Sequence, residues 1–172
     1  SDQQRSVLTA AMRQVEQLLR ASMITFGIEP PTTPDARWCF DQFFAELNSR
    51  FDGGFDPGLS ISACPAELTP PSGLLILGRL QGRPVGCGAL KFHKKEPAEL
   101  KRMWIAQSAR GLGVGGRLLA ELEDAKNHLQ SEQKRIEHEV ARYTNLTQMT
   151  ALTAKIISDA VSQWHPASNQ QN

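Results

Sequence analysis

The segment IAQSARGLGVGGRLL, residues 105–119, places four of the chain's 13 glycines within six positions. A strand-like apolar run ends at Ile105, and Leu118 and Leu119 begin an amphipathic helical pattern. Glycines remove the side chains that keep a ligand away from backbone amides. The first turn of a helix leaves N–H groups unpaired beside the positive end of its dipole. The segment therefore predicts a strand, a tight turn and a helix that together bind an anionic group, most often a phosphate.

Three consecutive strands are predicted before this turn. Residues 74–77 and 85–90 are apolar runs on either side of a short glycine-containing turn, which is the pattern of a hairpin. Residues 99–105 alternate polar and apolar side chains, which predicts the third strand. An antiparallel sheet therefore precedes the glycines.

Two other phosphate-binding motifs do not fit this sequence and strand order. A P-loop needs Gly-Lys-Ser or Gly-Lys-Thr, which the chain lacks. The dinucleotide fingerprint G-x-G-x-x-G is formally present as Gly111, Gly113 and Gly116. Its glycines normally follow the first strand of a series of βαβ units, whereas here antiparallel strands come first. The context is wrong for a dinucleotide fold.

The flanking sequence predicts further elements. Before the sheet we expect a helix over 1–20, a strand over 23–28, a helix over 35–51 capped by Asp35, and a loop over 52–72. After the turn we expect the helix to end near 130, followed by a strand over 136–143 and a last helix over 146–157. We divide the chain into an N-terminal helix at 1–21, one domain at 22–160 and a disordered polar tail at 161–172.

Composition narrows the class of protein. The 172 residues carry 19 basic and 18 acidic side chains, a balance that does not indicate a nucleic-acid binder. Between Lys91 and Arg117 the balance is seven basic to two acidic, which suits an anionic ligand or a solvated face. No apolar stretch approaches the 18 residues of a membrane span. Three scattered cysteines predict neither disulfides nor a metal site, and we expect a cytoplasmic protein.

Residues Arg110 to Gly115 resemble the Arg/Gln-x-x-Gly-x-Gly/Ala pyrophosphate loop of the GNAT superfamily of acetyl-CoA-dependent N-acetyltransferases. The resemblance covers residues 22–153 and is strongest over 83–125. It implies an α/β fold with a mixed, mostly antiparallel central sheet flanked by helices.

The resemblance also implies roles for individual residues. The co-substrate would be acetyl-CoA, with Glu99 as the general base or, alternatively, as a surface charge. The remaining residues implied to bind acetyl-CoA, through its pyrophosphate or its pantetheine arm, are Met103, Trp104, Ile105, Arg110, Gly111, Leu112, Gly113, Val114, Gly115 and Asn145. Lys101, Arg102 and Arg117 would attract the 3′-phosphate or simply be solvated.

The C-terminal part departs from the family pattern. Thr153 stands where the resemblance implies a tyrosine that protonates the thiolate, and the last two strands do not appear. This loss of pattern after Leu152 suggests an altered C-terminus, for instance through a shifted reading frame. The only tyrosine is Tyr143.

We expect acetyl transfer from acetyl-CoA to a primary amine of a small molecule or peptide by direct attack. The alternative is a non-catalytic acyl-CoA-binding module of a dimeric transcriptional regulator. Residues 3–19 resemble the last helix of a MarR-type repressor, where such helices pair in a homodimer, although an ordinary packing helix fits equally well. We expect no membrane contact, and no direct nucleic-acid contact from this segment.

Overall fold

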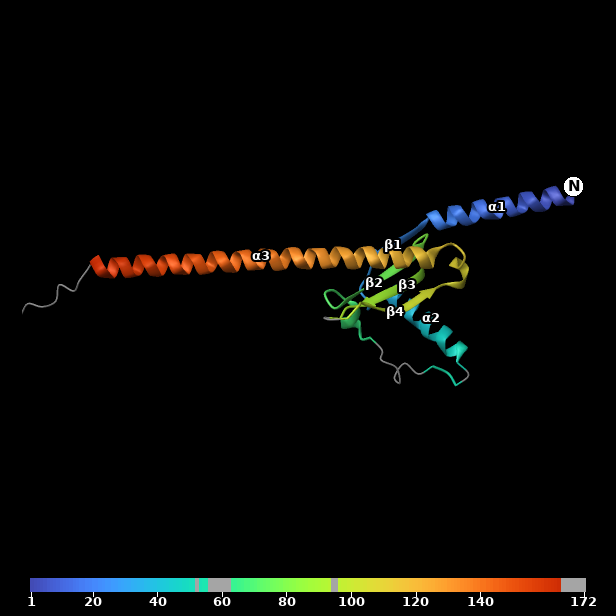
Figure 1. Ribbon diagram of the computed structural model, residues 1–172. Coiled ribbons are helices and arrows are strands. Elements are labelled where there is room, and N and C mark those ends of the chain that lie inside the picture. Colours follow the sequence, from blue (N-terminus) through green and yellow to red (C-terminus); the bar gives the residue numbers. More distant parts are fainter. Residues whose placement is uncertain (52, 56–62, 94–95, 165–172) are drawn as a thin grey trace, which may run out of the picture. The chain divides into compact units, whose positions relative to one another are not determined.

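The computed structural model describes residues 1–51, 53–55, 63–93 and 96–164 (Figure 1). The chain divides into two units, Ser1–Ala125 and Lys126–Asn172, and each is described by itself. The elements in chain order are α1 (Asp2–Ser22), β1 (Ile24–Ile28), α2 (Pro34–Arg50), η2 (Pro65–Leu68), β2 (Gly73–Leu80), β3 (Arg83–Lys91), β4 (Glu99–Ile105), η3 (Gln107–Ala109) and α3 (Val114–Trp164). The predicted helices and strands up to residue 105 are confirmed.

One four-stranded sheet, in the order β1-β2-β3-β4, organises the first unit. All three pairings are antiparallel. The β2–β3 hairpin turns through Gln81 and Gly82, both at positive φ, as a two-residue turn that follows the twist of its strands requires. The described residues contain no further strand beyond β4, so β4 is an edge of this sheet.

A bulge interrupts β4 close to its middle. Cys87 pairs with Trp104, but Ala89 pairs with Lys101, so β4 holds one residue more than β3 over this stretch. Arg102 lies in the bulge at φ 51°. Its guanidinium lies 4.2 Å from the Phe40 ring centroid and donates to the Ala63 carbonyl at 2.7 Å, so its head group is neither solvated nor directed at a phosphate.

Helices supply apolar side chains to the sheet. Ala36, Cys39 and Phe40 of α2 join Leu75, Leu77, Cys87, Ala89 and Trp104 in one buried cluster. Leu118 and Leu122 of α3 are also buried, and they approach β3 at Gly88. A Cβ at Gly88 would lie 2.9 Å from Leu122 Cδ1 and 3.1 Å from Met103 Sδ. Glycine at this position therefore lets the beginning of α3 lie close to the strand.

The interactions of two side chains, Asp35 and Arg117, differ from the roles that the sequence predicted for them. The cap of α2 is Thr33, whose hydroxyl accepts from the Ala36 amide at 3.3 Å, while Asp35 forms an ion pair with Arg79. Arg117 donates to the carbonyls of Ala21 and Ile24 at 2.6 and 3.1 Å. Arg117 therefore fastens the start of α3 to the α1–β1 junction, although the residue stays exposed.

The strand predicted over 136–143 is wrong, because these residues and the helix predicted over 146–157 belong to one continuous α3. No glycine or proline occurs between Gly116 and Pro166, so nothing in the chain ends the helix. Within the predicted loop at 52–72 lies the short helix η2, and residues 52 and 56–62 are outside the described residues. Of the predicted tail, 161–164 are helical and 165–172 are outside the described residues.

Candidate functional site

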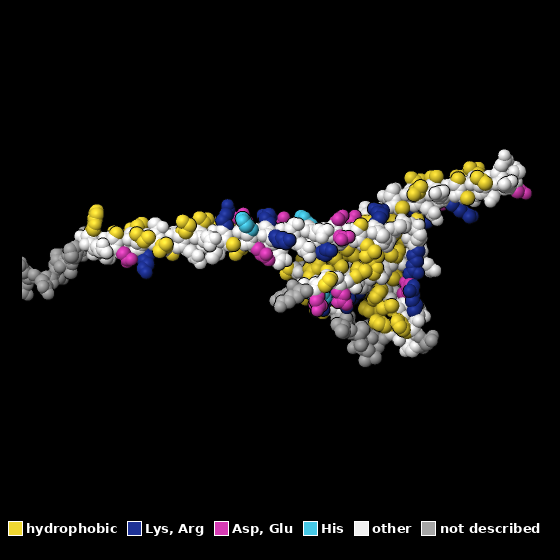
Figure 2. Space-filling view, in the orientation of Figure 1, with side chains coloured by type: hydrophobic (Ala, Val, Ile, Leu, Met, Phe, Trp, Pro, Cys, Tyr) yellow, Lys and Arg dark blue, Asp and Glu magenta, His cyan; other side chains and the backbone are white. Residues whose placement is uncertain are grey.

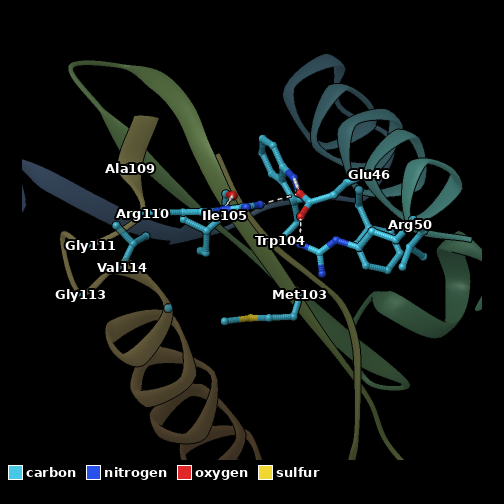
Figure 3. A pocket seen from close by; sticks show the side chains of 13 residues that line it. Glu46, Arg50, Met103, Trp104, Ile105, Ala109, Arg110, Gly111, Gly113 and Val114 are labelled. Carbon is cyan, nitrogen blue, oxygen red and sulfur yellow. Dashed lines mark hydrogen bonds and ion pairs between the residues drawn. The ribbon is translucent and has the colours of Figure 1, made fainter. Parts of the chain in front are cut away.

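A cleft of about 540 Å³ opens between α2, the end of β4 and the turn that leads into α3 (Figure 3). It is lined by Phe43, Glu46, Leu47, Arg50, Met103, Trp104, Ile105, Ala109, Arg110, Gly111, Gly113, Val114 and Gly115. Its floor is the edge strand, and one end is the glycine-rich turn. The segment that the sequence singled out therefore forms much of one concave site.

The turn depends on backbone conformations that favour glycine. Gly111 and Gly113 have φ of 80° and 72°. A Cβ at Gly113 would meet no atom within 4 Å, so space is open above it. The Arg117 amide donates to the Gly113 carbonyl at 3.2 Å, which is the first bond of the helical ladder. The amides of residues 114–116 therefore begin α3 without a carbonyl one turn earlier, and they can bind an anion.

Glu46 links α2 to the turn across the cleft. Its Oε2 accepts a hydrogen bond from Arg110 Nη2 at 2.6 Å and from Trp104 Nε1 at 3.0 Å, and Oε1 pairs with Arg50. Arg110 Nε also donates to the Ile105 carbonyl at 3.1 Å. Figure 3 shows the Glu46 carboxylate between the two guanidinium groups. The position of the Arg110 side chain is therefore fixed by α2 as well as by its own turn.

The electrostatics of this cluster favour an ionised carboxylate and an anionic ligand. Partial desolvation opposes ionisation of Glu46, but the hydrogen bond and charge of Arg110, the charge of Arg50 and the indole donor together hold its pKa below the ordinary value. One carboxylate between two guanidinium groups leaves a net positive charge. That charge adds to the positive end of the α3 dipole beside it.

Most of the residues predicted to bind the co-substrate meet in this cleft. Eight of them line it: Met103, Trp104, Ile105, Arg110, Gly111, Gly113, Val114 and Gly115. Leu112 does not, because its side chain packs in the buried cluster around Ile24 and Val85 and its amide donates to the Ala109 carbonyl. Asn145 lies in the α3 stretch of the second unit and stays a prediction.

Glu99, the predicted general base, is the first residue of the edge strand β4 and does not line the cleft. One oxygen of Glu99 lies 2.5 Å from Lys101 Nζ, and the other lies 3.5 Å from His93 Nε2. The hydrogen bond from Lys101, aided by His93, holds the pKa of Glu99 below its ordinary value. Thr153 is exposed on α3 and donates its hydroxyl to the Met149 carbonyl. Tyr143 is also exposed on α3, within the second unit.

Sequence reasoning missed the α2 wall of the cleft. Phe43 and Leu47 belong to the aromatic and apolar stripe of the helix predicted over 35–51, and such a stripe is typical of a face that packs in the core. The signal that could have separated them was Glu46, which stands within that stripe with Arg50 one helical turn later. A carboxylate on an apolar helix face needs a partner, and its partners here are in the cleft.

The residues that the structure describes contain no group of three or more His, Cys, Asp or Glu side chains that could hold a metal ion. No helix among them is both long and apolar enough to cross a membrane.

Comparisons with known proteins agree with this fold. The model of the acetyltransferase (GNAT) family matches residues 40–147. A Klebsiella pneumoniae subsp. pneumoniae protein assigned as an acyl-CoA N-acyltransferase is 26% identical, with a TM-score of 0.50 over 62% of this chain and 65% of that one. The chain thus spans a little under two thirds of that protein.

Two more distant structures also align. An Elizabethkingia anophelis GNAT family acetyltransferase with acetyl-CoA bound is 23% identical, with a TM-score of 0.41 over 62% of this chain and 60% of that one. A Staphylococcus aureus acetyltransferase of the same family is 14% identical, with a TM-score of 0.49 over 64% and 68%. Comparison with curated proteins gives no match. Since the family model covers more than half of the chain and the strand–turn–helix segment lies inside it, the chain belongs to the GNAT acetyltransferase family.

Proposed function

We propose that this chain binds acetyl-CoA in the cleft and transfers its acetyl group to a primary amine by direct attack. The observation that carries the proposal is the convergence of an anion-binding turn, the Arg110 guanidinium and an open strand edge in one cleft of about 540 Å³. Each of these three features suits a different part of a long, phosphate-bearing thioester.

The pyrophosphate is assigned to the turn. The amides of residues 114–116 begin a helix, the end of the helix dipole beside them is positive, and the Arg50–Glu46–Arg110 cluster carries a net positive charge. Gly113 leaves the approach to these amides open. A diphosphate carries its charge on oxygens that accept several such donors at once.

The pantetheine arm is assigned to the edge of β4. An edge strand exposes backbone N–H and C=O groups that an extended amide chain can pair with, as an added strand would. The strand from Ile105 back to Glu99 covers about 20 Å. An arm that lies along it would carry the thioester past the bulge toward Glu99, which begins the same strand.

The nucleophile is a neutral amine, so the reaction needs a base and no charged nucleophile. The amine must lose a proton before its lone pair attacks the thioester carbonyl carbon. A C–N bond then forms and the C–S bond breaks, and the nitrogen gives up a second proton through water as the departing thiolate takes one up. We assign the base to Glu99, acting directly or through water, and the final proton to water, because Thr153 cannot replace a phenol.

The second candidate function is a binding module without turnover. Two observations favour it: Thr153 occupies the position expected for the acid, and Glu99 does not line the cleft. Coenzyme A release, measured with acetyl-CoA and a panel of small-molecule and peptide amines, separates the two functions. Release that depends on both substrates supports the transferase. Tight binding of acetyl-CoA with no release for any amine supports the binding module.

A further inference from the structure

The α3 stretch of the second unit, Lys126–Trp164 in the part that the structure describes, carries apolar side chains that no other described residue of this unit covers. Ten large apolar residues there are each more than half exposed: Ile136, Val140, Tyr143, Leu146, Met149, Leu152, Ile156, Ile157, Val161 and Trp164. Figure 2 shows hydrophobic side chains recurring along this part of the helix. A monomeric protein rarely exposes so continuous an apolar surface.

We propose that this stretch pairs, antiparallel, with the same stretch of a second copy of the chain. The first argument is periodicity. Positions 136, 140, 143, 147, 150, 154, 157, 161 and 164 follow one another at alternating steps of four and three, and they carry Ile, Val, Tyr, Thr, Thr, Ala, Ile, Val and Trp. These positions form a heptad seam over about four heptads, with large apolar residues at both ends and two threonines and an alanine in the middle, and this period suits a helical partner of the same period.

The second argument is the shape of the seam. The side chains in the middle of the seam are small, and a groove of about 390 Å³ lies there. It is lined by Thr147, Thr150, Ala151 and Ala154, with Tyr143 and Leu146 beside them. Large residues flank this groove on both sides. If two copies run antiparallel about a two-fold axis between 147 and 150, Tyr143 of each faces Ala154 of the other and enters the partner's groove. Val140 then faces Ile157, and Ile136 faces Val161, so both of these layers are apolar, and Thr147 faces Thr150 next to the two-fold axis.

The third argument is charge. Beside the seam, the antiparallel register sets Glu137 near Ser158 and Glu139 near Ala160, so no like charges meet. A parallel register would instead set Glu132 of each copy near Glu137 of the other, which is unfavourable. The only charged residues in the second half of the stretch, 143–164, are Lys155 and Asp159. A helix that binds lipid surfaces is normally rich in basic residues on its polar face, so this balance disfavours a membrane partner.

The fourth argument is size. The seam from 136 to 164 is about 43 Å long. It presents six large side chains that are each more than half exposed, with Leu146 beside them. Covering these side chains on both copies removes a surface area from solvent that is on the order of the 800 Å² per partner that specific interfaces bury. The surface is therefore sufficient for a stable dimer without help from the first unit.

Analytical ultracentrifugation of the full chain tests the proposal. We expect a reversible dimer at micromolar concentration, and we expect Ile157→Glu to weaken it by at least about 100-fold, because each copy would bury a carboxylate against Val140 of the other. The matched control is Gln148→Glu, which adds the same charge to the polar side of the same helix and should leave the dimer intact. Acetyl-CoA binding by each variant reports that the first unit is folded.

Cysteine cross-linking tests the register in a Cys64→Ser background, since Cys64 is exposed. Tyr143→Cys mixed with Ala154→Cys should form an intermolecular disulfide, and neither variant should do so alone. Linkage of Tyr143→Cys to itself would overturn the antiparallel register.

Three results would overturn the proposed interface. One is a chain that stays monomeric at 100 micromolar. Another is a dimer that Leu8→Glu in α1 breaks and Ile157→Glu does not. The third is a monomer whose helix binds phosphatidylglycerol vesicles instead. None of these results bears on acetyl transfer, so the two proposals fail separately.

Discussion

At the scale of single residues, Glu46 controls how much positive charge the cleft offers. Its carboxylate accepts from Arg110 and Trp104 and pairs with Arg50, and it stays ionised because its pKa is lowered. It therefore holds Arg110 in place, but it also opposes an incoming diphosphate.

Glu46→Gln should tighten the binding of acetyl-CoA by roughly two- to fivefold. The amide oxygen can still accept from Arg110, while one negative charge leaves the cleft and the attraction for phosphate rises. Titration calorimetry with acetyl-CoA measures this. Asp41→Asn is the matched control, because it removes the same charge from an exposed position of α2 outside the cleft and should leave the affinity unchanged. Weaker binding by Glu46→Gln would contradict the account of this carboxylate.

Glu99→Gln should lower kcat by about 100-fold, the lower end of what a positioned base contributes. The affinity for acetyl-CoA should not change, because Glu99 does not line the cleft. Steady-state coenzyme A release gives kcat, and a parallel binding measurement gives the affinity for acetyl-CoA. Glu96→Gln, an exposed glutamate three positions earlier, is the control. If both variants turn over at the rate of the parent chain, Glu99 is a surface charge.

At the scale of elements, the contact between the start of α3 and β3 sets the position of the turn. Leu118 and Leu122 are buried, and Gly88 gives them room. A side chain at Gly88 would push the helix, and with it the amides of the turn, away from the sheet.

Gly88→Val should therefore lower the free energy of unfolding by about 1–3 kcal/mol, the usual range for overpacking a core. Gly116→Ala is the control, since its added Cβ meets nothing within 4 Å and should be neutral or slightly stabilising. Urea denaturation followed by circular dichroism measures both variants. Equal stability of Gly88→Val and the parent chain would contradict this packing.

The sequence predicted the elements up to residue 105 because local signals are strong there. Prolines and glycines bound each segment, and strand alternation is distinct from helical spacing. The strand predicted at 136–143 was wrong because Ile136, Val140 and Tyr143 are spaced for a helix. Glu46 was missed because two of its partners, Trp104 and Arg110, are 58 and 64 positions away along the chain. Only the folded sheet brings them together.

At the scale of the whole molecule, the two units have different kinds of surface. The first buries apolar residues in two clusters around the sheet, and it also exposes the large apolar residues of α1 from Val7 to Leu19. The second exposes an apolar seam along one helix. The cleft of the first unit is therefore the place that we propose for ligand chemistry, and the seam of the second is the place that we propose for association.

Acid should destabilise the chain below the ordinary glutamate pKa of 4.5. Glu46, Glu67 and Glu99 each have a lowered pKa in the folded chain, through Arg110, Lys91 and Lys101 respectively. The unfolded chain therefore binds more protons as the pH falls from 4.5 toward these lower values, and the free energy of unfolding decreases over that window. Thermal denaturation between pH 3 and 7 measures the loss. A midpoint that is flat below pH 4.5 would contradict the ion pairs.

The most direct measurement of the central claim is calorimetric titration of acetyl-CoA into the parent chain and two glycine variants. Gly113→Leu and Gly82→Leu place the same side chain at φ of 72° and 78°, each with no atom within 4 Å of the new Cβ. The backbone strain is thus matched, but only Gly113 lies in the cleft. We predict that the parent chain and Gly82→Leu bind acetyl-CoA with similar affinity and that Gly113→Leu binds at least tenfold more weakly. Equal affinity in all three proteins, or no binding by the parent chain, would contradict the assignment of this turn as the pyrophosphate site.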